Sequence, residues 1–179
     1  MSLPWQDSVR IAMLVPVCTV AEAVQAAAAG ARLVDVGHAD ALIPAIRSVA
    51  GGVRICGYGE AADIVPDVGL AARTGAGLIC ADLPAADGAA RSGIATGRIL
   101  VRTGPTGVEP CSQAGWASLV DLDEWAGSAP RAEAVAAVCG WLGVSVIRTR
   151  QVTEIRRCID MTESILGRRP PAWAVRGLA

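Results

Sequence analysis

The sequence contains no lysine, asparagine or phenylalanine, and only one histidine. All sixteen basic side chains are therefore arginines, and chemistry that depends on a lysine or asparagine side chain is excluded. The six cysteines form no Cys-x-x-Cys pair, and the lone His38 cannot complete a Cys/His cluster at zinc-finger spacing. No metal site is predicted from these residues, and we expect all six thiols to be reduced and structural.

Long apolar runs and concentrated positive charge are also missing. No uninterrupted apolar run reaches the ~18 to 20 residues that a membrane span needs. The first residues do not combine a basic region, an apolar stretch and a small-residue cleavage site, as a signal peptide would. The net charge is -1 and the arginines are scattered, which argues against nucleic acid as a partner. The sequence therefore predicts a cytoplasmic protein with neither a membrane nor a nucleic-acid partner.

The chain alternates short β-rich apolar runs with longer alanine-rich helical stretches, a pattern typical of α/β proteins with a parallel sheet. Its 179 residues, 53% of them hydrophobic, are enough for one domain with a full core. We assign residues 1–166 to this domain and expect an irregular tail at 167–179. Seven strands are predicted, at residues 10–17, 32–36, 53–58, 77–81, 98–102, 117–122 and 144–147.

Helices are predicted between most of these strands, at residues 19–30, 39–49, 60–73, 130–142 and 152–166. Residues 84–96 are only weakly helical in pattern, and 103–113 are expected to form a loop. The turn after the first strand reads PVCTV and lacks the Gly-x-Gly-x-x-Gly of an open dinucleotide-binding sheet. The pattern slightly favours a TIM-barrel-like (β/α) barrel. We expect this barrel to be trimmed or incomplete, because such barrels usually take about 250 residues.

Arg148 and Arg150 follow the last predicted strand, at the end where parallel α/β proteins bind ligands. A guanidinium offers a planar fork of donors that suits phosphate or carboxylate, so the pair suggests an anion site. The alternative is that Arg150 caps its surroundings or is solvated.

Other strand ends carry Asp35, Asp82 and the nearby His38. Asp35 either contributes to a site or only caps backbone amides, and His38 is either a general base or a surface side chain. The acidic run at residues 121–124 either holds a divalent cation or is a solvated loop.

The order of these strands resembles dihydropteroate synthase, the pterin-binding β/α barrel of folate biosynthesis. The similarity is best in PRAEAVAA (130–137) followed by GVSVIRTRQV (143–152), which looks like the family's last helix and strand, usually ending Arg-Val-His-Asp-Val. GARLVDVG (30–37) and GAGLICADL (75–83) are similar to the family's second and fourth strands. The resemblance implies a pterin-binding β/α barrel and covers most of the chain.

Several family motifs are altered. The loop after the first strand lacks the family's Asn and most of its length, and the pterin-contacting Asn of the fourth strand falls on Ala81, beside Asp82. The Ser-Arg-Lys after the family's seventh strand is replaced by Asp123-Glu124-Trp125, a reversal from basic to acidic. One barrel unit is expected to be lost or compressed between Asp82 and Ala117.

These departures favour a divergent, non-catalytic paralogue. We expect it to keep a residual site for a small anionic or pterin-like ligand, formed by Arg148, Arg150, Asp35, Asp82 and His38, or to pair with a second copy or a related subunit. The alternative is an active enzyme that condenses a pterin pyrophosphate with p-aminobenzoate, for which the resemblance would imply Mg²⁺ as cofactor.

Overall fold

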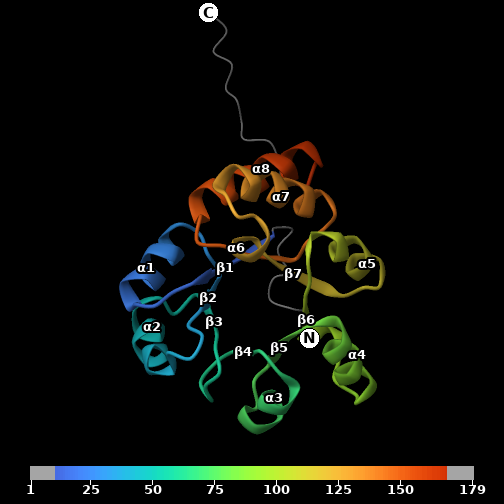
Figure 1. Ribbon diagram of the computed structural model, residues 1–179. Helices are drawn as coiled ribbons and strands as arrows, with labels where there is room; N and C mark the ends of the chain where they lie inside the picture. Colours follow the sequence, from blue (N-terminus) through green and yellow to red (C-terminus); the bar gives the residue numbers. More distant parts are fainter. Residues whose placement is uncertain (1–10, 169–179) are drawn as a thin grey trace, which may run out of the picture.

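Eight parallel strands close into a barrel in the computed structural model, which describes residues 11–168. Each strand pairs with its neighbours in sequence, and the last pairs with the first (Figure 1). Arg10 of the predicted first strand and residues 169–179 of the predicted tail lie outside the described residues. The strands are β1 (Ala12–Pro16), β2 (Leu33–Asp35), β3 (Arg54–Cys56), β4 (Ile64–Val65), β5 (Leu78–Ala81), β6 (Ile99–Arg102), β7 (Ala117–Asp121) and β8 (Val146–Arg148).

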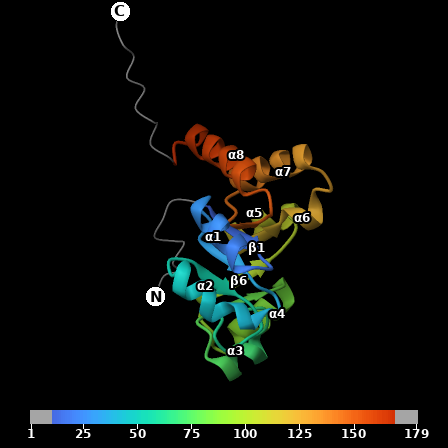
Figure 2. The same ribbon diagram turned by 90° about the vertical axis from the view of Figure 1, so that its left-hand side faces the viewer.

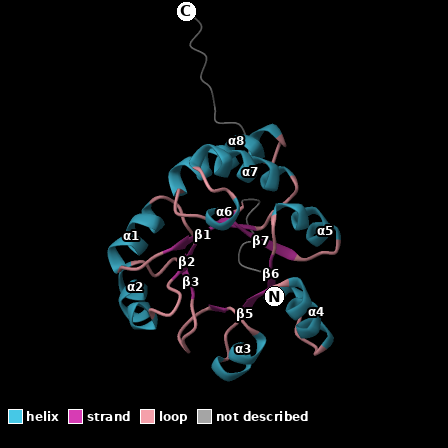
Figure 3. Ribbon diagram, viewed as in Figure 1, coloured by secondary structure: helices cyan, strands magenta, loops and turns pink. Residues whose placement is uncertain are grey.

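Helices surround the barrel (Figure 3). They are α1 (Val20–Ala28), α2 (Ile43–Val49), α3 (Val68–Thr74), α4 (Leu83–Arg91), α5 (Val108–Gln113), α6 (Leu122–Trp125), α7 (Ala129–Trp141) and α8 (Val152–Ile165). The short α6 lies inside their ring, near β7 (Figure 3). Short 3-10 segments occupy Asp40–Leu42, Thr96–Arg98 and Pro105–Gly107. The predicted β/α barrel is confirmed. None of the described helices is long and apolar enough to cross a bilayer.

The prediction of seven strands was one too few. The missed strand, β4, lies inside the stretch 60–73 that was expected to be helical. Ile64 pairs with Cys56 on one side and with Leu78 on the other, so this two-residue strand completes the barrel. Its side chains are buried and its length gives no periodicity, which makes it indistinguishable from a helical segment by pattern.

The compressed unit is the third, and not the one expected between Asp82 and Ala117. No helix separates β3 from β4 in the described chain, where residues 57–63 form only a turn. The region between Asp82 and Ala117 is complete, since it holds α4, β6 and α5. The predicted loop at 103–113 was wrong because Pro110 falls in the first turn of α5, where a missing N–H costs no helical hydrogen bond.

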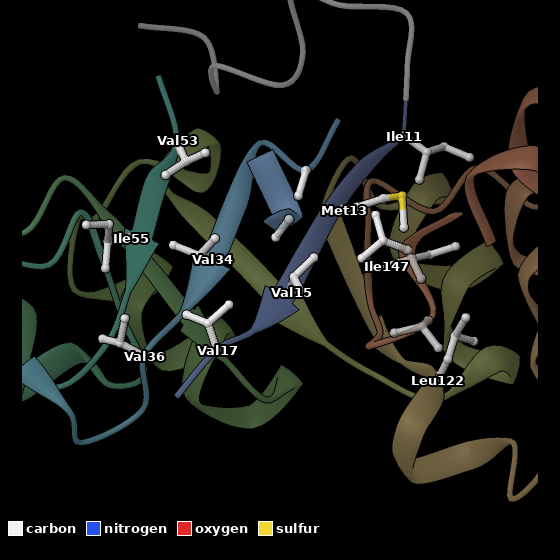
Figure 4. Packing of buried hydrophobic residues seen from close by; sticks show 14 of the residues in the cluster. Ile11, Met13, Val15, Val17, Val34, Val36, Val53, Ile55, Leu122 and Ile147 are labelled. Atoms are coloured by element: carbon white, nitrogen blue, oxygen red, sulfur yellow. The ribbon is translucent and has the colours of Figure 1, made fainter. Parts of the chain in front are cut away.

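Alternation along the strands separates two apolar layers. Residues that point into the barrel form one cluster: Ala12, Leu14, Leu33, Ile64, Leu78, Leu100, Ala117, Leu119 and Val146, with Cys56 and Cys80 against it. Their neighbours in sequence, such as Met13, Val34 and Ile147, point outward and pack beneath the helices (Figure 4). The carboxyl ends of the strands are therefore free to carry polar side chains above a closed apolar interior.

Two polar contacts tie α8 to the start of β1. The Ile11 N–H donates to Oε1 of Glu163 at 3.0 Å, and Arg156 Nη1 donates to the Ile11 carbonyl at 3.2 Å. Glu163 is buried, and its Oε2 accepts no hydrogen bond from the described protein. The last helix thus fixes the first strand at the point where the barrel closes.

Candidate functional site

The carboxyl ends of the strands surround a pocket of about 580 Å³, which we call the barrel pocket. Its wall includes the last inward-facing residue of six strands, because every second side chain of a strand points into the barrel. It is lined by Leu14, Asp35, Gly37, His38, Cys56, Gly57, Tyr58, Pro66, Cys80, Ala81, Asp82, Arg102, Leu119, Asp121 and Arg148. This is the end at which β/α barrels bind their ligands.

Arg148 is the central cation of the barrel pocket. Its Nε donates to Oδ2 of Asp35 at 3.0 Å, and its Nη1 donates to Oδ2 of Asp121 at 2.7 Å. Burial by itself lowers the pKa of this guanidinium, but the carboxylates of Asp121 and Asp35 more than reverse the effect and raise the pKa above its ordinary value. Arg148 is therefore permanently charged and already holds two counterions.

The aspartates have structural as well as electrostatic partners. Asp35 Oδ1 accepts the Gly37 N–H at 2.9 Å, so Asp35 both caps a turn and pairs with Arg148. Asp82 is the N-cap of α4, where Oδ1 accepts the Ala85 N–H at 2.9 Å. These side chains end their strands and begin the next turn or helix, which explains why they are fixed in place.

The acidic run at 121–124 forms α6 and its cap, and each of its carboxylates meets an arginine. Asp121 caps the helix through Oδ1 and holds Arg148 through Oδ2. Glu124 Oε2 accepts from Nη2 of Arg102 at 2.7 Å, and Asp123 Oδ2 lies 3.5 Å from Nη1 of Arg150. The run is neither a free loop nor a cation site.

A magnesium ion does not fit these residues. A hard cation needs several carboxylates that are free to turn their oxygens toward it. Here the three carboxylates of the run face arginines, and the described residues hold no group of three or more metal-binding side chains in a suitable arrangement.

Arg150 does not join Arg148. It lies beyond the end of β8, and its side chain is 69% exposed. It lines a separate cavity of about 460 Å³ between β1 with α1 and the start of α8, which we call the side pocket. The side pocket is lined by Val15, Pro16, Val17, Cys18, Glu22, Gln25, Ala26, Ala29, Arg150, Val152, Thr153 and Glu154. The two predicted arginines therefore belong to different cavities.

His38 lies in the barrel pocket and stacks on Tyr58. The ring centroids are 4.0 Å apart and the ring planes differ by 17°. His38 follows β2 and Tyr58 follows β3, so the stack joins two neighbouring loops at the pocket's edge. Tyr58 keeps 43% of its surface exposed. The prediction that His38 contributes to a ligand site stays a prediction, as does its alternative role as a surface side chain or a general base.

Two thiols that the sequence indicated only as structural also line the barrel pocket. Burial is the main cause that raises the pKa of both Cys56 and Cys80, the latter to about 11, so both remain neutral near pH 7. Arg102 was not predicted as a site residue, and Asp121 was considered only as a ligand of a divalent cation. The signal that points to them is that each ends a strand on its inward-facing side.

Counting carboxylates and guanidiniums alone, the barrel pocket is formally slightly acidic. Asp35, Asp82 and Asp121 face Arg102 and Arg148, which leaves one excess negative charge. Such a lining can accept hydrogen bonds from donors on a small polar ligand, above an apolar floor that includes Leu14 and Leu119.

No protein-family model and no curated protein matches the sequence. Solved structures do match the fold. Rv1207 of Mycobacterium tuberculosis aligns at 23% identity over 91% of this chain and 94% of its own, with a TM-score of 0.73. Dihydropteroate synthase of Yersinia pestis aligns at 16% identity over 88% of this chain and 93% of its own, with a TM-score of 0.70. A Coxiella burnetii dihydropteroate synthase in complex with pteroic acid aligns at 13% identity over 88% and 94%, with a TM-score of 0.71.

These alignments span nearly the whole length of each of the three solved chains, although few residues are identical. The resemblance drawn from the motifs is thus confirmed at the level of the fold: this chain folds as a barrel of the dihydropteroate synthase type.

Proposed function

We propose that the chain is a non-catalytic cytoplasmic protein with a dihydropteroate synthase-like barrel that binds a small, planar, pterin-like ring in the barrel pocket. The observation that carries this proposal is the pairing of Arg148 with both Asp35 and Asp121. Arg148 is the cation best placed to assist a reaction, but its charge is already balanced by two carboxylates of the pocket wall.

Displacement of pyrophosphate requires donors or a metal that stabilise the charge developing on the leaving group. Arg148 is held by two carboxylates, Arg102 is held by Glu124, and the sequence has no lysine to replace them. Loss of several members of a catalytic unit is usually disabling. These features support binding without turnover.

The lining suits a flat ring with hydrogen-bond donors along one edge. Asp82 uses Oδ1 to cap α4, which leaves its other oxygen with capacity to accept. The apolar side chains and neutral thiols of the floor offer contact to a ring face, and Tyr58 presents an exposed aromatic ring at the edge. A bicyclic heterocycle is of a size for a pocket of about 580 Å³.

The test is calorimetry with a neutral pterin, together with an assay of the purified protein with a pterin pyrophosphate and p-aminobenzoate. We expect saturable pterin binding that Asp82→Ala weakens, no product, and no effect of Asp87→Ala, which removes an exposed carboxylate on α4. Absence of binding would contradict the proposal. Turnover that Arg148→Ala abolishes would establish the alternative, an active enzyme.

A role in subunit pairing is favoured by one further observation. Helices α7 and α8 lie side by side, as Figures 1 and 2 both show. These two helices carry four large apolar side chains that are each more than half exposed: Val138 and Trp141 on α7, and Met161 and Ile165 on α8. We call these four residues the α7–α8 patch and propose that a second copy of this chain covers it, because symmetric pairing is the commonest way to bury such a surface.

A further inference from the structure

The N-cap and the single turn of α6 carry two carboxylates that pair with the arginines of the barrel pocket. Asp121 holds Arg148 at 2.7 Å, and Glu124 holds Arg102 at 2.7 Å. Arg102 and Arg148 supply all the guanidinium groups of the pocket lining. Both cations of the pocket are therefore paired with the same four-residue helix or its cap.

We infer that α6 acts as an internal anion, which prevents phosphate-bearing and other anionic ligands from binding in the barrel pocket. An incoming phosphate would need the same guanidinium donors, because Arg binds phosphate and carboxylate through the same planar fork. Carboxylates already accept from Nε and Nη1 of Arg148 and from Nη2 of Arg102. A phosphate would therefore compete with Asp121 and Glu124 for these cations, and it would meet Asp35 and Asp82 as additional like charges. The arrangement selects against negative charge.

The carboxylates of α6 are held where they compete effectively. Leu122 is buried, and the Ala126 N–H donates to the Leu122 carbonyl, which anchors the helix. Asp121 Oδ1 accepts from the N–H groups of Asp123 and Glu124, so Oδ2 is turned toward Arg148. An anion that is already positioned pays little further conformational entropy to remain bound.

This inference deepens the proposed function and rests on it for the identity of the ligand pocket. The pocket would then accept only uncharged or cationic rings. In this respect it would differ from a pocket that binds a diphosphate ester. The inference does not require that any reaction occurs.

The experiment measures pyrophosphate binding by calorimetry to the wild-type protein and to the double variant Asp121→Asn/Glu124→Gln. Both substitutions keep size and hydrogen-bonding capacity while they remove charge, and Asn remains a good helix N-cap. We expect the variant to bind pyrophosphate about tenfold or more tightly than wild type. The matched control is Asp87→Asn, which removes the carboxylate of the exposed pair with Arg91 and should give no gain.

Adding Arg102→Gln to the double variant should remove most of the gain, which places the bound anion in the barrel pocket. Equal affinity of wild type and double variant, or an equal gain in Asp87→Asn, overturns the inference. If the double variant does not fold, Glu124→Gln alone carries the test, because its pair with Arg102 is about half exposed and its loss costs little stability. A folded Glu124→Gln with no gain overturns the inference as well.

Neutral pterin binding, measured on the same proteins, separates the two proposals. A gain in pyrophosphate affinity without pterin binding contradicts only the proposed function. Pterin binding without a gain in pyrophosphate affinity contradicts only the role of α6.

Discussion

Asp121 and Arg148 are direct cross-strand neighbours: they end β7 and β8 at the same register position, and their side chains pair at 2.7 Å. Asp35 reaches the same guanidinium from β2. The three residues lie far apart in sequence, and the closure of the barrel brings them together. The resulting cluster is partly buried, with Arg148 24% and Asp121 8% exposed, so its members depend on one another for charge compensation.

Replacing Arg148 by methionine should destabilise the protein. Asp35 and Asp121 would then lose their shared counterion in a partly buried site. Loss of one partner from a buried pair typically costs several kcal/mol. Because the cluster retains some exposure, we expect a loss of about 2–4 kcal/mol in the free energy of unfolding. Urea denaturation measures it. The control is Arg91→Met, which breaks an exposed pair with Asp87 and should cost less than about 1 kcal/mol. Equal costs for the two variants would show that the cluster is not a stabilising unit.

Glu163 should tolerate replacement by glutamine but not by alanine. In Glu163→Gln the side-chain oxygen can still accept the Ile11 N–H, and a buried charge is removed. We expect Gln to leave stability unchanged or to raise it by about 1 kcal/mol. Glu163→Ala leaves the Ile11 N–H without an acceptor and opens a cavity, so a loss of about 2–3 kcal/mol is expected. Thermal or urea unfolding distinguishes the two, and a Gln variant as unstable as the Ala variant would rule out this explanation.

Stability should fall on the alkaline side. Burial raises the pKa of Cys80 from 9.0 to about 11 in the folded state, and that of Cys139 likewise. Between about pH 9 and 11 the unfolded chain loses these protons first, so the folded state holds more protons and its stability decreases as pH rises. Cys56, Cys111 and Cys158, whose pKa burial also raises, contribute in the same direction.

Urea midpoints at several pH values across this window measure the effect. The double variant Cys80→Ala/Cys139→Ala should lose less stability between pH 9 and 11 than wild type, although it is less stable at pH 7. Cys18→Ala, which changes an exposed thiol, should follow the wild-type curve. An unchanged slope in the double variant would contradict the assignment.

The α7–α8 patch should control self-association. Trp141→Asp and Ile165→Asp each place a charge in an apolar surface and should convert a dimer to a monomer, as measured by sedimentation equilibrium. Val49→Asp is the control, since Val49 is a comparably exposed apolar residue on α2. A wild-type protein that is monomeric at high concentration would refute pairing between copies.

The alternation of apolar runs and alanine-rich segments predicted a parallel α/β fold and most of its elements, because strand and helix periodicities are local properties. It favoured the closed barrel only slightly, and the resemblance of the motifs made the barrel the main prediction. Residues 64–65 escaped prediction because a two-residue strand carries no period of its own. Asp35, Asp82, His38 and Arg148 were selected as strand-end residues, and they do line one pocket. Arg150 was selected by the same argument but lies in the side pocket.

The sequence by itself determined the alternation of strands and helices. It also determined that arginine is the only strongly basic side chain present, and that an acidic run stands where the family has a basic motif. Only the tertiary structure decided which charges meet. Barrel closure sets Asp121 opposite Arg148 and turns Glu124 toward Arg102, and such pairing depends on strand register, which couples residues that are distant in sequence. Electrostatic energy depends on distance in space and not on separation along the chain. Two arginines near the end of one strand therefore suggested a site for an anionic ligand, whereas in the folded barrel the arginines of the pocket already pair with carboxylates.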